Sequence, residues 1–143
     1  MKAPVFLFVL LWSLTSYGQS GDTHIDSLHI LINQGKQGKA QIMSDSLMKA
    51  HPENGDYRFF NALTLGQIGL SDSGLLVLQP LLLHSPVRND VKELEYSLYF
   101  QNQLYTKVDS LAEGIMGLNQ PFSHNWQSHV WVHAVAKINL GEY

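Results

Sequence analysis

The sequence predicts an all-helical protein whose helices come in repeated pairs. Pro52, Pro86 and Pro121 recur at intervals of 34 and 35 residues, and each follows an apolar segment of helical character. A proline lacks the N–H that a helix needs to continue and is common just past a helix end, so we expect each of these three prolines to mark the end of a unit. A recurring interval of this length is typical of arrays of helix pairs. No alternating apolar and polar pattern of useful length predicts a strand.

A second landmark lies about halfway between the prolines. It is found seventeen residues before or after a proline, at Gly35, Gly69 and Gln103. After the third proline the equivalent glycine is Gly141, twenty residues on, which predicts an insertion of about three residues. A glycine just past a helix end supplies the left-handed backbone that the turn between two packed helices needs. We therefore expect each pair to turn at this landmark.

Seven helices are expected, because apolar residues recur every three or four positions in each segment and so form one face. The predicted ranges are 24–33, 38–50, 56–68, 73–84, 89–103, 106–118 and 124–140. Leaving the fourth helix aside, the apolar residues in the same order are Ile25, Leu28 and Ile32; Ala40, Met43 and Leu47; Tyr57, Phe60 and Leu63; Val91, Leu94 and Leu98; Val108, Leu111 and Ile115; and Trp126, Val130, Trp131, Val132, Ala134, Val135 and Ile138.

The fourth helix is unusual because residues 75–83 are apolar nearly all round and include Pro80. Asp72 is its predicted N-cap. An interior proline removes one backbone hydrogen bond and clashes with the preceding turn, so either the helix bends at Gln79 or it is shorter than drawn. An apolar helix of this kind is typical of a buried position, and we expect neighbouring repeats to cover it on both sides. A run of nine residues is too short to span a membrane.

With these landmarks the chain resembles the tetratricopeptide repeat family, whose unit is about 34 residues of helix, turn and helix. In that family a small residue precedes the turn glycine by seven positions, and an alanine follows it by about five. The matching residues here are Ala62 and Ala134 before the glycine, and Ala40 and Gly74 after it. The repeat around Gln103 departs from this pattern, with Tyr96 and Val108 at the two positions. The resemblance covers residues 24–143 and implies a right-handed solenoid of antiparallel helix pairs.

Segment 1–18 has the three parts of a secretory signal peptide. Lys2 gives a positive start, residues 5–14 form an almost unbroken apolar run, and small residues stand at both ends of segment 16–18. We expect cleavage before Gln19, which leaves one helical repeat domain, 19–143, exported to the periplasm or cell envelope. The alternative is a buried N-terminal helix of the fold. No cysteine follows the cleavage site, which argues against a lipoprotein.

Composition disfavours several classes of function. After cleavage the chain keeps eight basic residues, the nine of the full sequence less Lys2, against twelve acidic ones. A net charge of about −4 leaves no basic surface for nucleic acid. The sequence has no cysteine, no glycine-rich phosphate loop and no Gly-x-Ser-x-Gly elbow. Glu93 and Glu95 point in different directions on a helix, which favours a solvated face over an acid and base pair. We predict a non-enzymatic protein without a cofactor.

Histidines form the one arrangement that could hold a metal ion. His129 and His133 are four residues apart, hence on one face of the last helix, and His124 lies about a turn earlier. Two such histidines can bind zinc or nickel, but the residues between them lack the glutamate of metalloprotease helices. The alternative is an aromatic-rich helix surface. Metal binding is therefore the more distant hypothesis, and we assign no metal ligand.

Recognition of another protein is the function that these patterns favour. A stacked array of helix pairs exposes a curved groove lined by the first helix of each pair. Through the glycine register, the resemblance assigns to this groove Phe59, Leu63 and Gln67; Glu93, Ser97 and Gln101; and Trp131, Val135 and Asn139. Such mixed aromatic, amide and carboxylate groups suit a protein or peptide partner. The alternative is that Phe59 and Trp131 fill space between repeats.

Two interpretations of the whole protein stay open. One is an interaction scaffold of the cell envelope. The other rests on resemblance alone: some outer-membrane β-barrel proteins begin with a signal peptide and a short helical repeat segment, and this chain would be that periplasmic segment. The last helix is too apolar to stand uncovered, and Tyr143 comes just after a turn glycine. We therefore expect the sequence to be part of a longer protein, with further repeats or a membrane barrel downstream.

Overall fold

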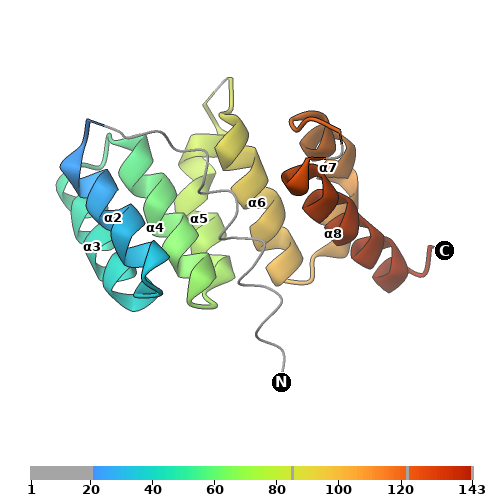
Figure 1. Ribbon diagram of the computed structural model, residues 1–143, viewed down its shortest axis with the longest axis horizontal. Helices are drawn as coiled ribbons and strands as arrows, with labels where there is room; N and C mark the ends of the chain where they lie inside the picture. The colour runs from blue at the N-terminus through green and yellow to red at the C-terminus, as the bar shows by residue number, and fades with distance from the viewer. Residues whose placement is uncertain (1–20, 85, 122, 143) are drawn as a thin grey trace.

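The computed structural model describes residues 21–84, 86–121 and 123–142. These residues form seven α-helices and no strand, which confirms the all-helical prediction (Figure 1). The helices are α2 (Thr23–Asn33), α3 (Gln37–Ala50), α4 (Gly55–Gln67), α5 (Ser71–Leu82), α6 (Asn89–Gln101), α7 (Tyr105–Gly117) and α8 (His124–Leu140). Every predicted helix end lies within two residues of the observed one. The predicted signal peptide, 1–18, falls outside the described residues.

The predicted turns adopt one common conformation. The backbone φ angle is 71° at Gly35, 87° at Gly69, 58° at Gln103 and 78° at Gly141. At each turn this residue's N–H donates to the carbonyl three residues back, and the next N–H donates to the carbonyl five residues back, at 2.8 to 3.1 Å. These bonds satisfy carbonyls that a helix end otherwise leaves free. Glutamine at position 103 thus makes the same left-handed turn as the three glycines.

The start of α5 differs from its prediction. The helix begins at Ser71, so Asp72 lies in its first turn, and the N-cap is Leu70, which makes no side-chain hydrogen bond there. The reason is that the left-handed turn reverses the chain so quickly that the next helix starts as soon as the turn is complete. The helix continues through Pro80 and ends two residues later at Leu82. Since Pro80 lies in the last turn, its missing N–H removes one bond where helical hydrogen bonding is about to stop.

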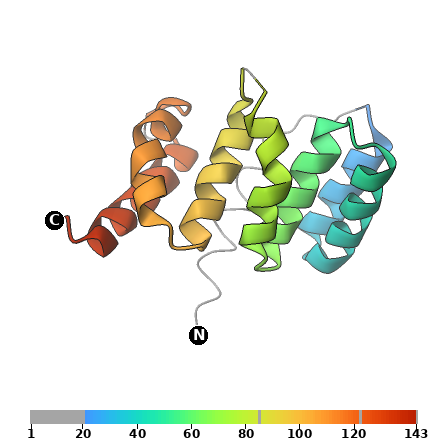
Figure 2. The same ribbon diagram turned by 180° about the vertical axis from the view of Figure 1, so that it is seen from behind.

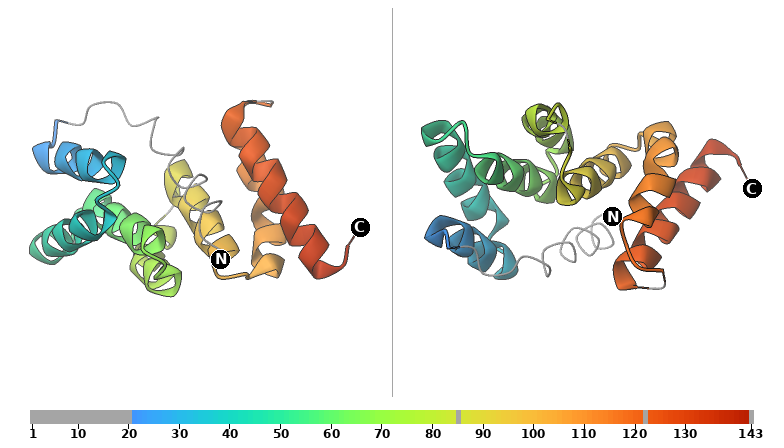
Figure 3. Two further views of the ribbon diagram at one scale, coloured as in Figure 1. Left: turned by 60° about the horizontal axis from the view of Figure 1, so that its bottom comes forward. Right: turned by 90° about the horizontal axis from the view of Figure 1, so that it is seen from above.

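Successive helices pack on each other in chain order. Figure 1 shows α2, α4, α6 and α8 toward the viewer, and Figure 2 shows α3, α5 and α7 on the opposite face. Seen from above, α5 stands behind α4 and α6, on the side away from α2 and α8 (Figure 3). α8 has 17 residues where α4 and α6 have 13, so the predicted insertion lengthens this helix.

The core consists of two clusters of buried apolar side chains, and α6 contributes to both. Val91, Leu94 and Leu98 belong to the cluster that joins α2 to α6. Tyr96 and Phe100, on the other face of α6, belong to the cluster formed with α7 and α8. One helix with two apolar faces therefore connects the two halves of the described chain.

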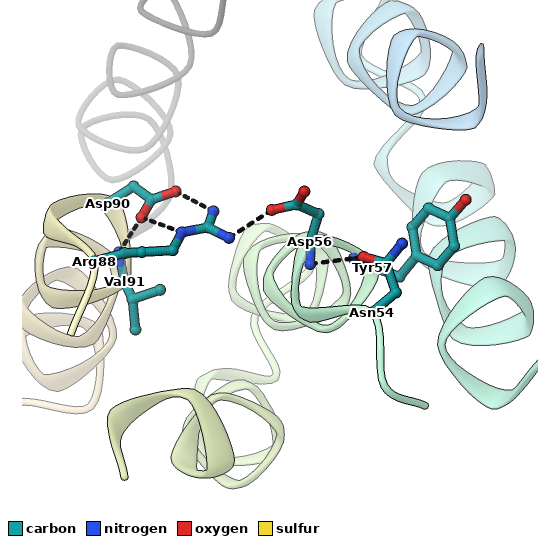
Figure 4. Close-up of polar contacts among 6 residues, drawn as sticks. All are labelled: Asn54, Asp56, Tyr57, Arg88, Asp90 and Val91. Atoms are coloured by element: carbon teal, nitrogen blue, oxygen red, sulfur yellow. Dashed lines mark hydrogen bonds and ion pairs between the residues drawn. The ribbon is translucent and has the colours of Figure 1, made fainter. Parts of the chain in front are cut away.

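Polar bonds also connect consecutive pairs at one end of the helices. Arg88, just before α6, bonds Asp56 in the first turn of α4 and Asp90 in the first turn of α6 (Figure 4). One pair earlier, the Tyr57 hydroxyl donates to Asp22, the N-cap of α2, at 2.8 Å. Asp22, Asp56 and Asp90 follow one another at the repeat interval of 34 residues. The same repeat position therefore supplies the acceptor in both bonds between pairs, Asp22 for Tyr57 and Asp56 for Arg88.

The expectation that α5 is covered on both sides is wrong. Its buried residues are Ser71, Gly74 and Leu78. In contrast, Leu76 is 71% exposed and Leu83, just past the helix end, is 80% exposed. The reason is that α4 and α6 are the helices that pack on α5 within the described chain, and they cover one side of it.

Exchanging turn residues tests the left-handed turn. Gln103→Gly should raise the free energy of unfolding by about 0.5–1 kcal/mol. The change relieves left-handed backbone strain in the folded chain, and this gain exceeds the loss from the greater entropy of the unfolded chain. Gly35→Gln is the matched reverse and should lower it by a similar amount. No atom lies within 4 Å of a Cβ built at Gly35, so the cost there is conformational. Urea unfolding followed by circular dichroism measures both, and equal stability of the two variants would contradict the argument.

A second pair of variants tests the approach of α4 and α5. A Cβ at Gly74 would lie 2.9 Å from the carbonyl oxygen of Ala62 and 3.3 Å from a methyl carbon of Leu98. Gly74→Ala should therefore lower the free energy of unfolding by about 1–3 kcal/mol through overpacking. Gly114→Ala, inside α7 with nothing within 4 Å, should instead raise it by up to about 1 kcal/mol through helix propensity. Thermal unfolding in which both variants shift the same way would rule out a tight contact at Gly74.

Candidate functional site

The residues predicted to line a binding groove lie on α4, α6 and α8, and the group on α4 is largely covered. Phe59 and Leu63 belong to the first core cluster and are 4% and 1% exposed. The guanidinium of Arg88 lies over the Phe59 ring, 5.6 Å from its centroid. Gln67 is half-buried, and neither atom of its side-chain amide has a hydrogen-bond partner among the described residues.

The group on α6 makes polar contacts with neighbouring segments. The Glu93 carboxylate accepts a hydrogen bond from the Asn119 side-chain amide at 3.0 Å, and burial raises the pKa of this carboxyl above its ordinary value. Gln101 accepts from the hydroxyl of Ser71, at the start of α5, at 2.8 Å. Ser97 donates to the backbone carbonyl of Glu93. Two of the three residues therefore link α6 to other segments.

The group on α8 is the most exposed. Trp131 is 45% exposed, and its ring packs against Phe100 with 6.0 Å between centroids. Val135 is partly buried on the second core cluster, and Asn139 is exposed and donates to the carbonyl of Val135. The structure thus puts the nine residues on α4, α6 and α8, each the first helix of a pair, as the register predicts. The three groups differ in how exposed they are. Their role in binding stays a prediction.

A groove that the sequence did not predict lies over α6 and has two parts, one between α5 and α6 and the other between α6 and α7. Its larger part has a volume of about 530 Å³, and its smaller part about 110 Å³. Glu95 lines both parts, so they adjoin at this residue. We call this surface the α5–α7 groove. Its larger part is lined by Asp72, Leu75, Leu76, Gln79, Leu82, Leu83, Glu95 and Tyr99, and its smaller part by Lys92, Glu95, Leu111, Gly114, Ile115 and Leu118.

Both charged residues that line the larger part of the groove are acidic. Burial raises the pKa of the Glu95 carboxyl, and the hydrogen bond with the Tyr99 hydroxyl and the charge of Lys107 oppose this rise. The pKa of Tyr99 is also raised, first by burial and then by the neighbouring carboxylate. At the other end, Asp72 accepts a hydrogen bond from the Asn102 side-chain amide at 2.9 Å. The larger part therefore combines leucine walls with two carboxylates held in place by side-chain partners.

The sequence contains one signal for this groove, the run of leucines over residues 75–83. The run shows that α5 has more apolar surface than one packed face requires. It does not show which side of the helix α4 and α6 leave bare, because that depends on how the helices cross. The sequence pattern favours a solvated face for Glu95 over an acid and base pair, and it does not indicate a groove there.

The histidines of α8 have different surroundings. His129 is 6% exposed, its ring lies edge-on to Tyr96 at 5.6 Å, and neither ring nitrogen has a hydrogen-bond partner within the described chain. Burial lowers the pKa of His129 to about 4. His133 bonds the Asp109 carboxylate at 2.8 Å, and Lys137 bonds the same oxygen at 3.0 Å. Within residues 21–84, 86–121 and 123–142, no three potential ligands are grouped to hold a metal ion.

Comparison with known proteins finds no match to this chain among family models, curated proteins or solved structures. The tetratricopeptide resemblance therefore stays a prediction from the sequence. None of the helices that the structure describes is both long enough and apolar enough to cross a membrane.

The burial of His129 predicts a loss of stability in mild acid. Its pKa is about 4 in the folded chain against an ordinary 6.5, so the unfolded chain binds the proton first as the pH falls. Above about pH 6.5 His129 does not change the free energy of unfolding with pH. Between pH 6.5 and 4 it should lower the free energy of unfolding by about 3 kcal/mol in total. His129→Leu should remove this loss, and the exposed His84→Gln should keep it. Urea unfolding from pH 7 to 4 measures the difference, and a loss of unchanged size in His129→Leu would contradict the assignment.

Proposed function

We propose that this chain is a non-enzymatic interaction scaffold that is exported to the cell envelope and binds a protein partner in the α5–α7 groove. We further propose that its helix pairs form a right-handed, tetratricopeptide-like solenoid. Support for the solenoid comes from the left-handed turn and the linking aspartate, which both recur at the repeat interval. Support for export comes from the predicted signal peptide.

The observation that carries the binding function is the exposure of leucines around one groove. Leu76 and Leu83 are 71% and 80% exposed, and two further leucines of α5 line the same space. Scattered exposed leucines are ordinary, but leucines that converge on a concave surface are typical of sites where proteins meet. The polar groups at its edge are engaged, Asp72 with Asn102 and Glu95 with Tyr99. Such an arrangement suits contact with a partner better than chemical reaction.

Site-specific photocrosslinking in intact cells tests this function. Benzoylphenylalanine introduced at Leu76 or at Leu83 should capture the same protein from both positions, because both side chains border the groove. Ile42 is the matched control, since it is 67% exposed and stands on α3 at the repeat position that Leu76 occupies on α5. Addition of Leu82→Asp inside the groove should abolish the adduct. Capture that is equal from all three positions, or absent from the two groove positions, would contradict the proposal.

A further inference from the structure

The α5–α7 groove has the form that a docked helix requires. Its walls are themselves helices, with α6 as the floor between them. The wall residues follow helical spacing and are Leu75, Leu76, Gln79, Leu82 and Leu83 on one side and Leu111, Ile115 and Leu118 on the other. Side chains three and four residues apart form ridges that fit between those of another helix. α5 has 12 residues, which corresponds to about 18 Å, so it can contact a partner helix over about three turns.

Backbone hydrogen bonding also favours a helix over an extended peptide. The N–H and C=O groups within the walls already bond inside their own helices, so the groove offers no strand edge. An extended peptide in contact with leucine walls would bury backbone groups without partners, which costs free energy. A helix satisfies its own backbone and presents only side chains. The exposed leucines at positions 76 and 83 then contact an apolar stripe of the same spacing.

The charges at the groove indicate the sign of the charge that a bound partner carries. Asp72 and Glu95 are the charged residues that line its larger part. Lys92 lines the smaller part, and Lys107 acts on Glu95 through its charge. Glu95 is partly buried at the junction of the two parts. A cation there is attracted to the carboxylate, and an anion is repelled by it, more strongly than at a fully exposed site. The geometry therefore suits a basic side chain on the partner next to Glu95.

We propose that the α5–α7 groove binds an amphipathic helix of a partner protein. Its apolar stripe lies between α5 and α7, and its lysine or arginine pairs with Glu95. The inference rests on the proposed scaffold function and adds the secondary structure and charge of the bound segment. A second copy of this chain is the competing occupant, because α8 also exposes apolar side chains, among them Trp131 and Ile138.

The test uses three fluorescent synthetic helices of about three to four turns and the full chain. The first carries leucines every three or four residues with lysines beside them. The second has glutamates in place of the lysines, and the third has alanines in place of the leucines. Fluorescence anisotropy should show that the lysine helix binds about tenfold or more tighter than the glutamate helix. The alanine helix should not bind at the same concentrations.

Variants of the chain locate the binding. Leu76→Asp combined with Leu83→Asp should weaken binding of the lysine helix by about tenfold or more, because the two aspartates place charges opposite the apolar stripe of that helix. Ile42→Asp should leave affinity unchanged. Glu95→Gln, which keeps a hydrogen-bonding side chain beside Tyr99, should reduce the preference for lysine over glutamate to below about threefold. Helical circular dichroism equal to that of the wild type shows that each variant is folded.

Three results would overturn the inference. One is equal affinity for the lysine and glutamate helices. Another is binding that survives the double leucine change. The third is a free chain that sediments as a dimer and becomes monomeric on that change, since a second copy would then occupy the groove. If any of these occurs while the crosslinks at positions 76 and 83 to another protein persist, the partner chemistry is wrong and the scaffold function stands. If those crosslinks are also absent, both proposals fail.

Discussion

A left-handed residue that recurs at a fixed interval sets the architecture of the described chain. At Gly35, Gly69 and Gln103 the chain reverses in the same way, so the second helix of each pair begins two residues later and packs back on the first. The turn thereby decides which residues meet. Gly74, five residues after one turn, lies against the backbone of Ala62, seven residues before it. A change in turn length would shift every contact of the pair.

The position of α6 explains both the core and the groove. Because its two faces serve the two clusters, its remaining side forms a floor between α5 and α7. This floor is fixed to α5 by two hydrogen bonds, from Ser71 to Gln101 at 2.8 Å and from Asn102 to Asp72 at 2.9 Å. Polar bonds that hold one wall against the floor lower the cost of ordering the groove when a partner binds. The bond from Asn102 also holds Asp72, one of the two carboxylates that line the larger part of the groove.

Local signals in the sequence predicted the helices and turns well, because proline, glycine and apolar spacing act within one or two turns of chain. Gln103 shows that position in the repeat predicts the turn better than residue type does. The repeat interval identifies Gln103 as a turn residue, although glutamine itself does not favour left-handed backbone. Burial was harder. The leucines of α5 predict a covered helix, yet Leu76 is 71% exposed, and the sequence leaves open whether Phe59 lines a groove or fills space, while the structure has it 4% exposed. Both depend on how helices distant in sequence cross, which spacing within one helix cannot show.

The repeat register argues that the fold does not require leucine at two of the groove positions, 75 and 83. Leu75 corresponds to Gln41 one repeat earlier and to Asp109 one repeat later, and Leu83 corresponds to Lys49 one repeat earlier. Both positions thus accept polar side chains in neighbouring pairs that form the same turn and pack in the same order. Leu83 adds little to folding stability, because it is 80% exposed and its apolar surface stays in water. Leucine at position 83 is therefore explained better by a second molecule that covers it than by the packing of the chain itself.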